Sequence, residues 1–320
     1  MNRLNLWLLI ALLLAAALSV ASGKIWVPLD AWTAADPRSI IIVELRLPRT
    51  LLALLVGGAL GLSGAVMQGY LRNPLADPGL FGVSSGAAFG AVVSLYFGYA
   101  VQLWLLPAFA LAGAGVTMAL LALIAGRSGS LILFTLAGMI LTSITGSLTA
   151  LAISLAPTPF VSSQIVTWLM GALTDRSWDD ITVALPLIVV GAALLATTAR
   201  SLDALTLGEQ AARSVGVDPG RLQLVVIAGT ALCVGAAVAS AGIIGFVGLI
   251  VPHMVRPFAG NRPSAILLPS ALGGAVLLTV ADSLVRLAPT VSELRLGIAM
   301  SMLGGPFFLY LLIRMRRRLA

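Results

Sequence analysis

Long apolar runs, separated by short polar connections, dominate the chain. They cover residues 4–22, 47–69, 80–100, 103–125, 131–156, 181–199, 222–241, 243–258, 264–285 and 296–313. Most of them approach the roughly 20 residues that a helix needs to cross a bilayer. They also lack the alternation that is typical of the strands of a membrane barrel. The pattern therefore predicts an all-α, polytopic membrane protein with about ten transmembrane helices.

The composition supports lipid as the solvent of this chain. Hydrophobic residues make up 59% of the sequence and charged residues 10%, whereas a soluble domain is about 25% charged. Small residues recur at every fourth position, which lines one face of a helix and lets a neighbouring helix approach closely. The two series are Gly82, Gly86 and Gly90, and Ala53, Gly57, Gly61 and Ala65. We expect a single transmembrane domain over residues 1–320.

Charge distribution predicts the orientation. With the N-terminus in the cytoplasm, the connections on that side contain an excess of arginine, including Arg72, Arg200 and Arg213. Cytoplasmic loops carry such an excess in most membrane proteins. An even number of spans then places the arginine-rich C-terminus inside as well. We expect the run 4–22 to be retained as the first helix, because it is long for a signal peptide and further spans follow it.

Enzymatic and metal chemistry are not expected within this chain. Its only lysine, Lys24, is not part of a phosphate-binding G-x-x-x-x-G-K-[ST] loop. The lone His253 and the lone Cys233 are far apart in sequence, so no metal site is predicted, and a haem-ligand role for His253 is not favoured. The net charge of +7 lies in membrane-flanking connections without interleaved aromatics, so no nucleic-acid partner is expected.

The acidic residues bear on the energy source. A proton- or sodium-coupled transporter usually carries ionisable groups within its spans, whereas the acids here lie in connections or at helix ends. Asp282 comes closest, and Arg286 one turn later predicts an ion pair at the end of a helix. An external energy source is therefore favoured, and an ion-coupled secondary transporter is the alternative.

The connection 200–221 contains a candidate coupling element. Residues 209–214 fit a short helix, and Gly216 suits its C-terminal cap. From the pattern alone, an ordinary amphipathic loop helix fits equally well. The stretch of interest comprises Leu207, Gly208, Glu209, Ala211, Ala212, Arg213 and Gly216.

These residues carry a family resemblance. The order Glu-x-Ala-Ala-x-x-x-Gly resembles the "EAA" coupling motif of ATP-binding-cassette (ABC) importer permeases. Three further stretches resemble the FecCD family in particular: LRLPRT at 45–50, RNPLADPG at 72–79 and GFVGLIVPH at 245–253. The resemblance covers essentially the whole chain. It implies the type II ABC importer permease fold, with ten helices and both termini in the cytoplasm of a bacterial inner membrane.

The family also implies partners. Two ATPase subunits would bind ATP and magnesium and would dock on the motif around Glu209, so this chain needs no cofactor of its own. A second permease copy, identical or related, would complete the pore. A periplasmic binding protein would dock on the other side, where arginines at the positions of Arg46, Arg49 and Arg286 meet glutamates in a cobalamin importer of the family. Anchoring to lipid headgroups is the simpler alternative for these arginines.

The resemblance further suggests a gate and a pathway. Asn73 and Leu75 would approach the start of the fifth span, Ser130 and Leu131. This start is more apolar than in the cobalamin permease, so closure by dewetting would replace a polar gate, unless Leu131 merely begins a helix. In this family the fifth span lines the pathway, which would involve Thr142, Ser143 and Ser147. Alternatively, these hydroxyls bond to carbonyls of their own helix.

The cargo is the least determined point. The FecCD family imports ferric siderophores, haem and cobalamin. We expect a ferric siderophore as the default cargo, with haem or cobalamin as alternatives within the same family.

Overall fold

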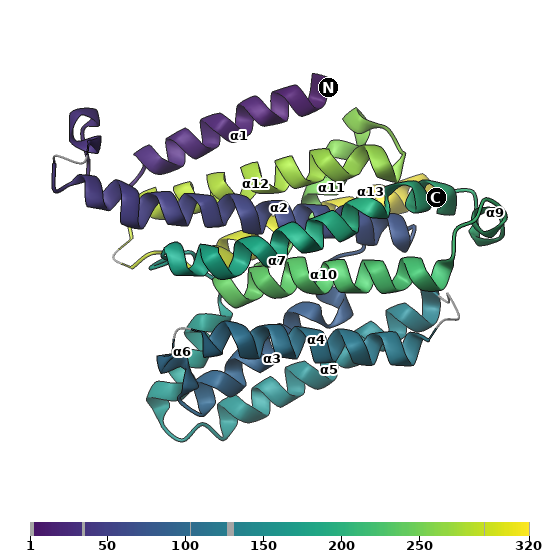
Figure 1. Cartoon of the computed structure of the whole chain (residues 1–320), viewed down its shortest axis with the longest axis horizontal. Helices are drawn as coiled ribbons and strands as arrows, with labels where there is room; N and C mark the ends of the chain where they lie inside the picture. Colours follow the sequence, from purple (N-terminus) through teal and green to yellow (C-terminus); the bar gives the residue numbers. More distant parts are fainter. Residues whose placement is uncertain (1–2, 34–35, 103, 127–130, 291, 320) are drawn as a thin grey trace.

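The computed structural model describes residues 3–33, 36–102, 104–126, 131–290 and 292–319, and in this part of the chain it is helical (Figure 1). The α-helices are α1 Arg3–Ala21, α2 Leu47–Tyr70, α3 Val83–Tyr96, α4 Leu105–Ala125, α5 Leu131–Ser154, α6 Pro159–Leu169, α7 Trp178–Thr197, α8 Ala199–Leu205, α9 Glu209–Ser214, α10 Pro219–Ala241, α11 Val247–Ala259, α12 Pro263–Leu287 and α13 Leu296–Leu319. A π-helical turn, Ile41–Arg46, leads directly into α2.

Eight of the described helices are long and apolar enough to cross a membrane, and α3 and α11 are shorter apolar helices. Each predicted run overlaps with one of these ten helices, so the predicted all-α membrane architecture is confirmed. The start of α1, the helix α9 and the end of α13 lie toward one end of the bundle, called here the α9 end (Figure 1). This arrangement agrees with an even number of crossings.

The α-helices within the runs 80–100 and 243–258 are shorter than the predicted runs. The helices α3 and α11 have 14 and 13 residues, or about 20 Å at 1.5 Å per residue, and the hydrocarbon core is about 30 Å thick. Both helices begin inside the protein. The Leu80 carbonyl accepts a hydrogen bond from Thr142, midway along α5, and Gly248 packs on Gly64 of α2.

Two short helices, α6 and α8, were not predicted from the sequence. The helix α6 follows Thr158, whose side chain accepts a hydrogen bond from the Val161 N–H, and Pro159 occupies its first turn. This is an ordinary helix start, but the segment is too short to stand out by hydropathy. The helix α8 occupies the first part of the predicted connection 200–221, so α9 is joined to α7 through a helix and not through a loop alone.

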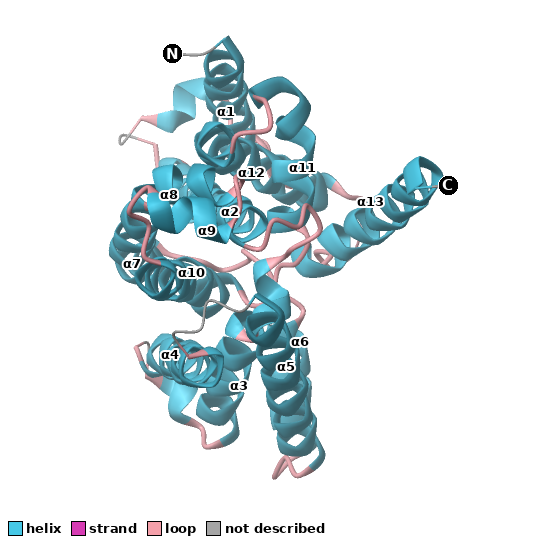
Figure 2. Ribbon diagram, turned by 90° about the vertical axis from the view of Figure 1, so that its right-hand side faces the viewer, coloured by secondary structure: helices cyan, strands magenta, loops and turns pink. Residues whose placement is uncertain are grey.

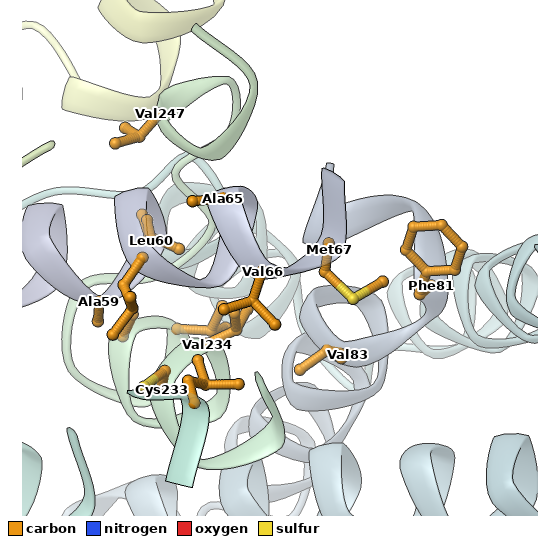
Figure 3. Packing of buried hydrophobic residues seen from close by; sticks show 14 of the residues in the cluster. Ala59, Leu60, Ala65, Val66, Met67, Phe81, Val83, Cys233, Val234 and Val247 are labelled. Carbon is orange, nitrogen blue, oxygen red and sulfur yellow. The ribbon is translucent and has the colours of Figure 1, made fainter. Parts of the chain in front are cut away.

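Small residues bring the central helices into contact, as predicted. A Cβ on Gly57 would overlap the Gly274 carbonyl of α12, and a Cβ on Gly61 would overlap the Ser270 carbonyl. On the second predicted face, Gly86 and Gly90 of α3 meet the backbone of α4 in the same way. The core beside these contacts joins α2 to α10 through buried residues such as Val66, Cys233 and Val234 (Figure 3).

Two helices keep apolar faces uncovered. Figure 2 shows α13 leaving the bundle at an angle, with most of its length away from the other helices. Its exposed side chains include Met302, Leu309 and Ile313. The helix α5 exposes Ile132, Ile140 and other apolar side chains along its length. These faces are suited to lipid or to another protein in the membrane.

The α2–α12 contact generates a stability prediction. Gly61→Ala places a methyl group on the Ser270 carbonyl, so the two helices must separate, and overpacking of this kind costs about 1–3 kcal/mol. Gly58→Ala is the matched control on the same helix, because its Cβ would lie 3.5 Å from the Ala271 carbonyl oxygen in ordinary contact. Thermal unfolding in detergent should show a loss for Gly61→Ala and none for Gly58→Ala. Equal stabilities would contradict the close packing.

Candidate functional sites of a membrane permease

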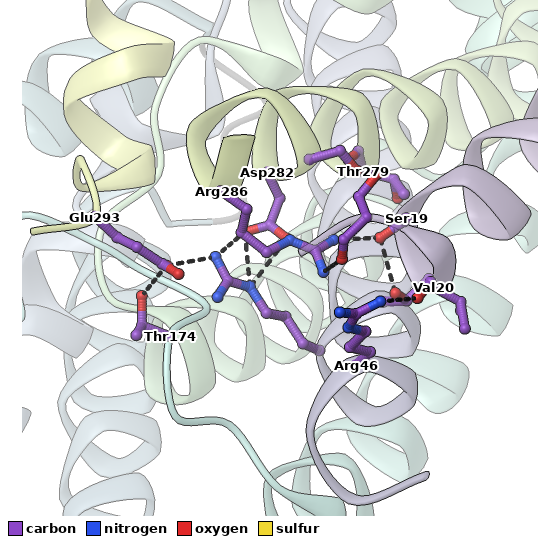
Figure 4. Close-up of polar contacts among 12 residues, drawn as sticks. Ser19, Val20, Arg46, Thr174, Thr279, Asp282, Arg286 and Glu293 are labelled. Carbon is purple, nitrogen blue, oxygen red and sulfur yellow. Dashed lines mark hydrogen bonds and ion pairs between the residues drawn. The ribbon is translucent and has the colours of Figure 1, made fainter. Parts of the chain in front are cut away.

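A cluster of charged side chains (Figure 4) lies where α2 begins and α12 ends, which is the end of the bundle opposite α9 (Figure 1). Arg49, in the first turn of α2, forks onto Asp282 near the end of α12. Its Nε and Nη2 donate to the two carboxylate oxygens at 2.8–3.1 Å. The same Nη2 lies 2.9 Å from Glu293 in the segment between α12 and α13. We call Arg46, Arg49, Arg286, Asp282 and Glu293 the arginine cluster.

The other two arginines are also engaged internally. Arg286 Nε lies 3.1 Å from Asp282, which confirms the predicted i,i+4 ion pair. Its Nη2 donates to the Ser19 hydroxyl of α1. Arg46 donates to the carbonyls of Val20, Ala21 and Ile25, just after and at the end of α1. The cluster therefore joins α1, α2 and α12.

Burial of this cluster is the main difference from a simple docking patch. Arg46, Arg49 and Arg286 are 5%, 8% and 4% exposed, and Asp282 is 0% exposed. The sequence could not reveal this buried cluster, because its partners Arg49 and Asp282 are separated by 233 residues. Their docking to a binding protein stays a prediction, and the structure adds that each guanidinium already has internal partners.

The residues between α12 and α13 contain a second functional candidate that the sequence analysis did not select. Glu293 accepts a hydrogen bond from the Thr174 hydroxyl at 3.1 Å as well as pairing with Arg49. Burial alone raises the pKa of Glu293, but the hydrogen bonds from Arg49 and Thr174 outweigh it and hold the pKa below its usual range. The carboxylate is therefore ionised at neutral pH.

The predicted coupling helix is present as α9, residues Glu209–Ser214. Gly216 has a φ of +88°, and it ends the helix because glycine adopts this left-handed conformation without strain. The N–H groups of Gly216 and Val217 donate to the carbonyls of Arg213 and Ala212, which is the Schellman pattern of a helix C-terminus.

The side chains of α9 divide into a buried and an open face. Ala212 is completely buried and anchors the helix to the bundle. Glu209 and Arg213 pair at 3.0 Å on the exposed side. Leu207 and Val215 flank the helix and are 74% and 67% exposed, which leaves two large apolar side chains open beside it. The segment 207–216 therefore presents a partly apolar surface at the α9 end.

Three of the four predicted gate residues meet in one cavity. Asn73, Leu75 and Leu131 line a space of about 360 Å³ whose remaining walls include Phe81 and Ile132. The Asn73 side chain accepts from the Leu75 N–H at 3.0 Å and fixes this turn. Ser130, the fourth predicted residue, lies outside the described residues. The lining is mainly apolar, and the role of these residues as a gate stays a prediction.

The hydroxyls of α5 separate into two groups. Thr142 and Thr145 donate to carbonyls of their own helix one turn back, which is the simpler of the two interpretations. Thr142 also reaches the Leu80 carbonyl at 3.2 Å. Ser143 and Ser147 lie on an exposed face of α5, so their place in a transport pathway stays a prediction.

The fold and these sites define a multi-pass membrane permease, and comparisons with known proteins place it in a family. The FecCD transport family matches residues 8–314. The chain belongs to this family and is an ABC importer permease, the class in which the ATPase is a separate subunit.

Relatives resemble the chain over nearly its whole length. It is 39% identical over 317 residues to the vitamin B12 import system permease protein BtuC of Shigella boydii, covering 97% of this chain and 96% of the relative. It is 40% identical over 279 residues to the cobalamin import system permease protein BtuC of Halobacterium salinarum, covering 87% and 74%. A solved structure of a metal-chelate type ABC transporter in an inward-facing conformation matches with a TM-score of 0.87, 31% identity and coverage of 97% and 98%.

The arginine cluster generates a second prediction. Asp282→Asn leaves Arg49 and Arg286 buried without their shared counter-ion, and breaking a buried ion pair costs about 3–5 kcal/mol. Asp36→Asn, in an exposed pair with Arg38, is the control and should have no measurable effect. Unfolding in detergent should separate the two variants clearly. A stable Asp282→Asn protein would show that the cluster does not hold α1, α2 and α12 together.

Proposed function

We propose that this chain is the membrane-spanning subunit of a cobalamin importer. The observation that carries the proposal is the similarity to vitamin B12 import permeases, at 39% identity over 97% of the chain. The alternating-access cycle of such an importer would move cargo from a binding protein at the arginine-cluster end to the cytoplasm at the α9 end.

A ferric chelate is the second candidate cargo. It is supported by the likeness to a transporter described as metal-chelate type, at 31% identity over 97% of this chain. The sequence-based preference for a ferric siderophore stays a prediction. Cobalamin ranks above it here because the relatives named for vitamin B12 are more similar in sequence.

The proposed assembly places the α9 end in the cytoplasm of a bacterial inner membrane, with both termini on that side. Two ATPase subunits, which would hold ATP and magnesium, dock on α9 and its exposed neighbours Leu207 and Val215. A second permease copy covers apolar faces of the kind that α5 and α13 leave open. The binding protein docks at the arginine cluster.

Cargo is tested by transport in liposomes. The permease is reconstituted with its ATPase and is supplied with binding protein loaded with either cyanocobalamin or a ferric hydroxamate siderophore. We expect ATP-dependent accumulation of cyanocobalamin and none of the ferric chelate. Uptake of the ferric chelate alone would replace the proposed cargo with the second candidate. Uptake driven by an ion gradient without the ATPase would overturn the importer class.

The coupling surface generates a further prediction. Leu207→Ser and Val215→Ser remove exposed apolar side chains that burial under an ATPase would stabilise by about 1.5–3 kcal/mol each, so each should weaken ATPase attachment about tenfold or more. Val101→Ser, 93% exposed in the short helix Tyr99–Val101, is the matched control. Co-purification at graded ATPase concentrations measures the effect. Unchanged attachment of both Ser variants would exclude this surface as the docking site.

A further inference from the structure

Glu293 occupies the place beside Arg49 that a carboxylate of a binding partner would need. Arg49 has two carboxylate neighbours, and they differ in accessibility: the Asp282 side chain is 0% exposed and the Glu293 side chain 22% exposed. Asp282 is also bound by Arg286, so its removal would leave two buried cations. Glu293 is bound by Arg49 and the neutral Thr174 hydroxyl, and it belongs to a segment between helices. Glu293 is therefore the carboxylate that can leave.

We propose that Glu293 is the internal occupant of a carboxylate-binding site on Arg49, and that a glutamate or aspartate of the docking binding protein displaces it. This inference rests on the proposed docking at the arginine cluster. The exchange replaces one ion pair with another while Asp282 stays paired with Arg49, so the buried guanidinium keeps a counter-ion throughout. It explains how an arginine that is only 8% exposed can serve a partner.

The exchange would reach the ends of α10 and α13, because Glu293 lies close to a packed junction between them. Four residues later, the Gly297 N–H at the start of α13 donates to the Gly171 carbonyl at 3.1 Å. A Cβ on Gly297 would overlap the carbonyls of Met170 and Ile243. The Ala172 N–H also donates to the Ala241 carbonyl at the end of α10 at 2.8 Å.

The hydrogen bond between Thr174 and Glu293 joins the two segments that lead into this junction. Thr174, which holds Glu293, follows the 170–172 segment, and Glu293 itself precedes α13. The residues 242–246 lead from the junction into α11, the short helix that begins inside the bundle. Displacing Glu293 would therefore break the hydrogen bond that joins the segment before α13 to Thr174. Both segments pack at this point against the beginning of the 242–246 loop.

The test is the affinity of the purified binding protein for the permease–ATPase complex in detergent or nanodiscs. Glu293→Gln removes the charge that competes for Arg49, so the Kd should fall about tenfold, equivalent to one broken charge-assisted contact of about 1.4 kcal/mol. Thr174→Val keeps the charge but removes one hydrogen bond to it, so it should tighten binding by a smaller factor in the same direction.

Asp180→Asn is the matched control. Asp180 lies at the same end of the bundle, pairs with Arg176 at 3.3 Å and has a side-chain exposure of 20%, close to that of Glu293. The Asp180→Asn substitution removes one negative charge without freeing Arg49, so the Kd of the binding protein should not change. The proposal is wrong if Glu293→Gln leaves the Kd unchanged or raises it, or if Asp180→Asn tightens binding equally.

The experiment also separates this inference from the proposed function. No binding of the binding protein to the unaltered complex would overturn docking itself, and the exchange with it. Because the measurement does not involve transport, a wrong cargo assignment leaves its outcome unaffected. A thermal unfolding midpoint for Glu293→Gln equal to that of the unaltered chain establishes that the affinity change does not arise from misfolding.

Discussion

The arrangement of the central helices depends on the ion pairs that the buried Asp282 carboxylate forms. A charge in a water-poor environment is tolerated only with a counter-charge and hydrogen bonds, and Asp282 obtains them from Arg49 of α2 and Arg286 of its own helix. Arg286 and Arg46 in turn hold the end of α1. Below this cluster, the contacts of Gly57 and Gly61 leave no space between α2 and α12, so these helices form a frame fixed at one end by charge and along its length by packing.

Polar side chains tie the two short helices to the frame by hydrogen-bonding to backbone carbonyls in or just before their first turns. Unpaired carbonyls are costly at membrane depth. Thr142 donates to the Leu80 carbonyl ahead of α3, and Gln68 donates to the carbonyls of Gly248 and Leu249 in the first turn of α11. Arg256 holds the other end of the Gln68 amide at 2.8 Å. The interrupted segments are thus built into the frame through side chains of α2 and α5.

The sequence predicted what depends on local pattern and missed what depends on distant partners. Apolar length located ten helices, and the small residues at 57 and 61 indicated a close contact without naming Gly274 and Ser270 as its other side. The bounds of α9 were predicted to the residue because its cap, Gly216, is local, whereas its coupling role stays a prediction. The ion pair of Arg49 with Asp282 joins positions 233 residues apart, and no spacing rule reaches that far. The runs around α3 and α11 were overestimated because their flanking loops are as apolar as helices.

The helix α12 provides the physical connection between the two candidate docking ends. At its start, the Asp203 carboxylate of α8 accepts hydrogen bonds from the N–H and hydroxyl of Ser264, and so satisfies N-terminal groups that a helix leaves unpaired. The helix α8 leads directly to α9. About 27 to 33 Å further on, at 1.5 Å for each residue after Ser264, the same helix carries Asp282 and Arg286. Gly274 and Ser270 lock α12 against α2, so the two helices form one packed pair between the α9 end and the arginine cluster. Pro269 removes one helical hydrogen bond within α12.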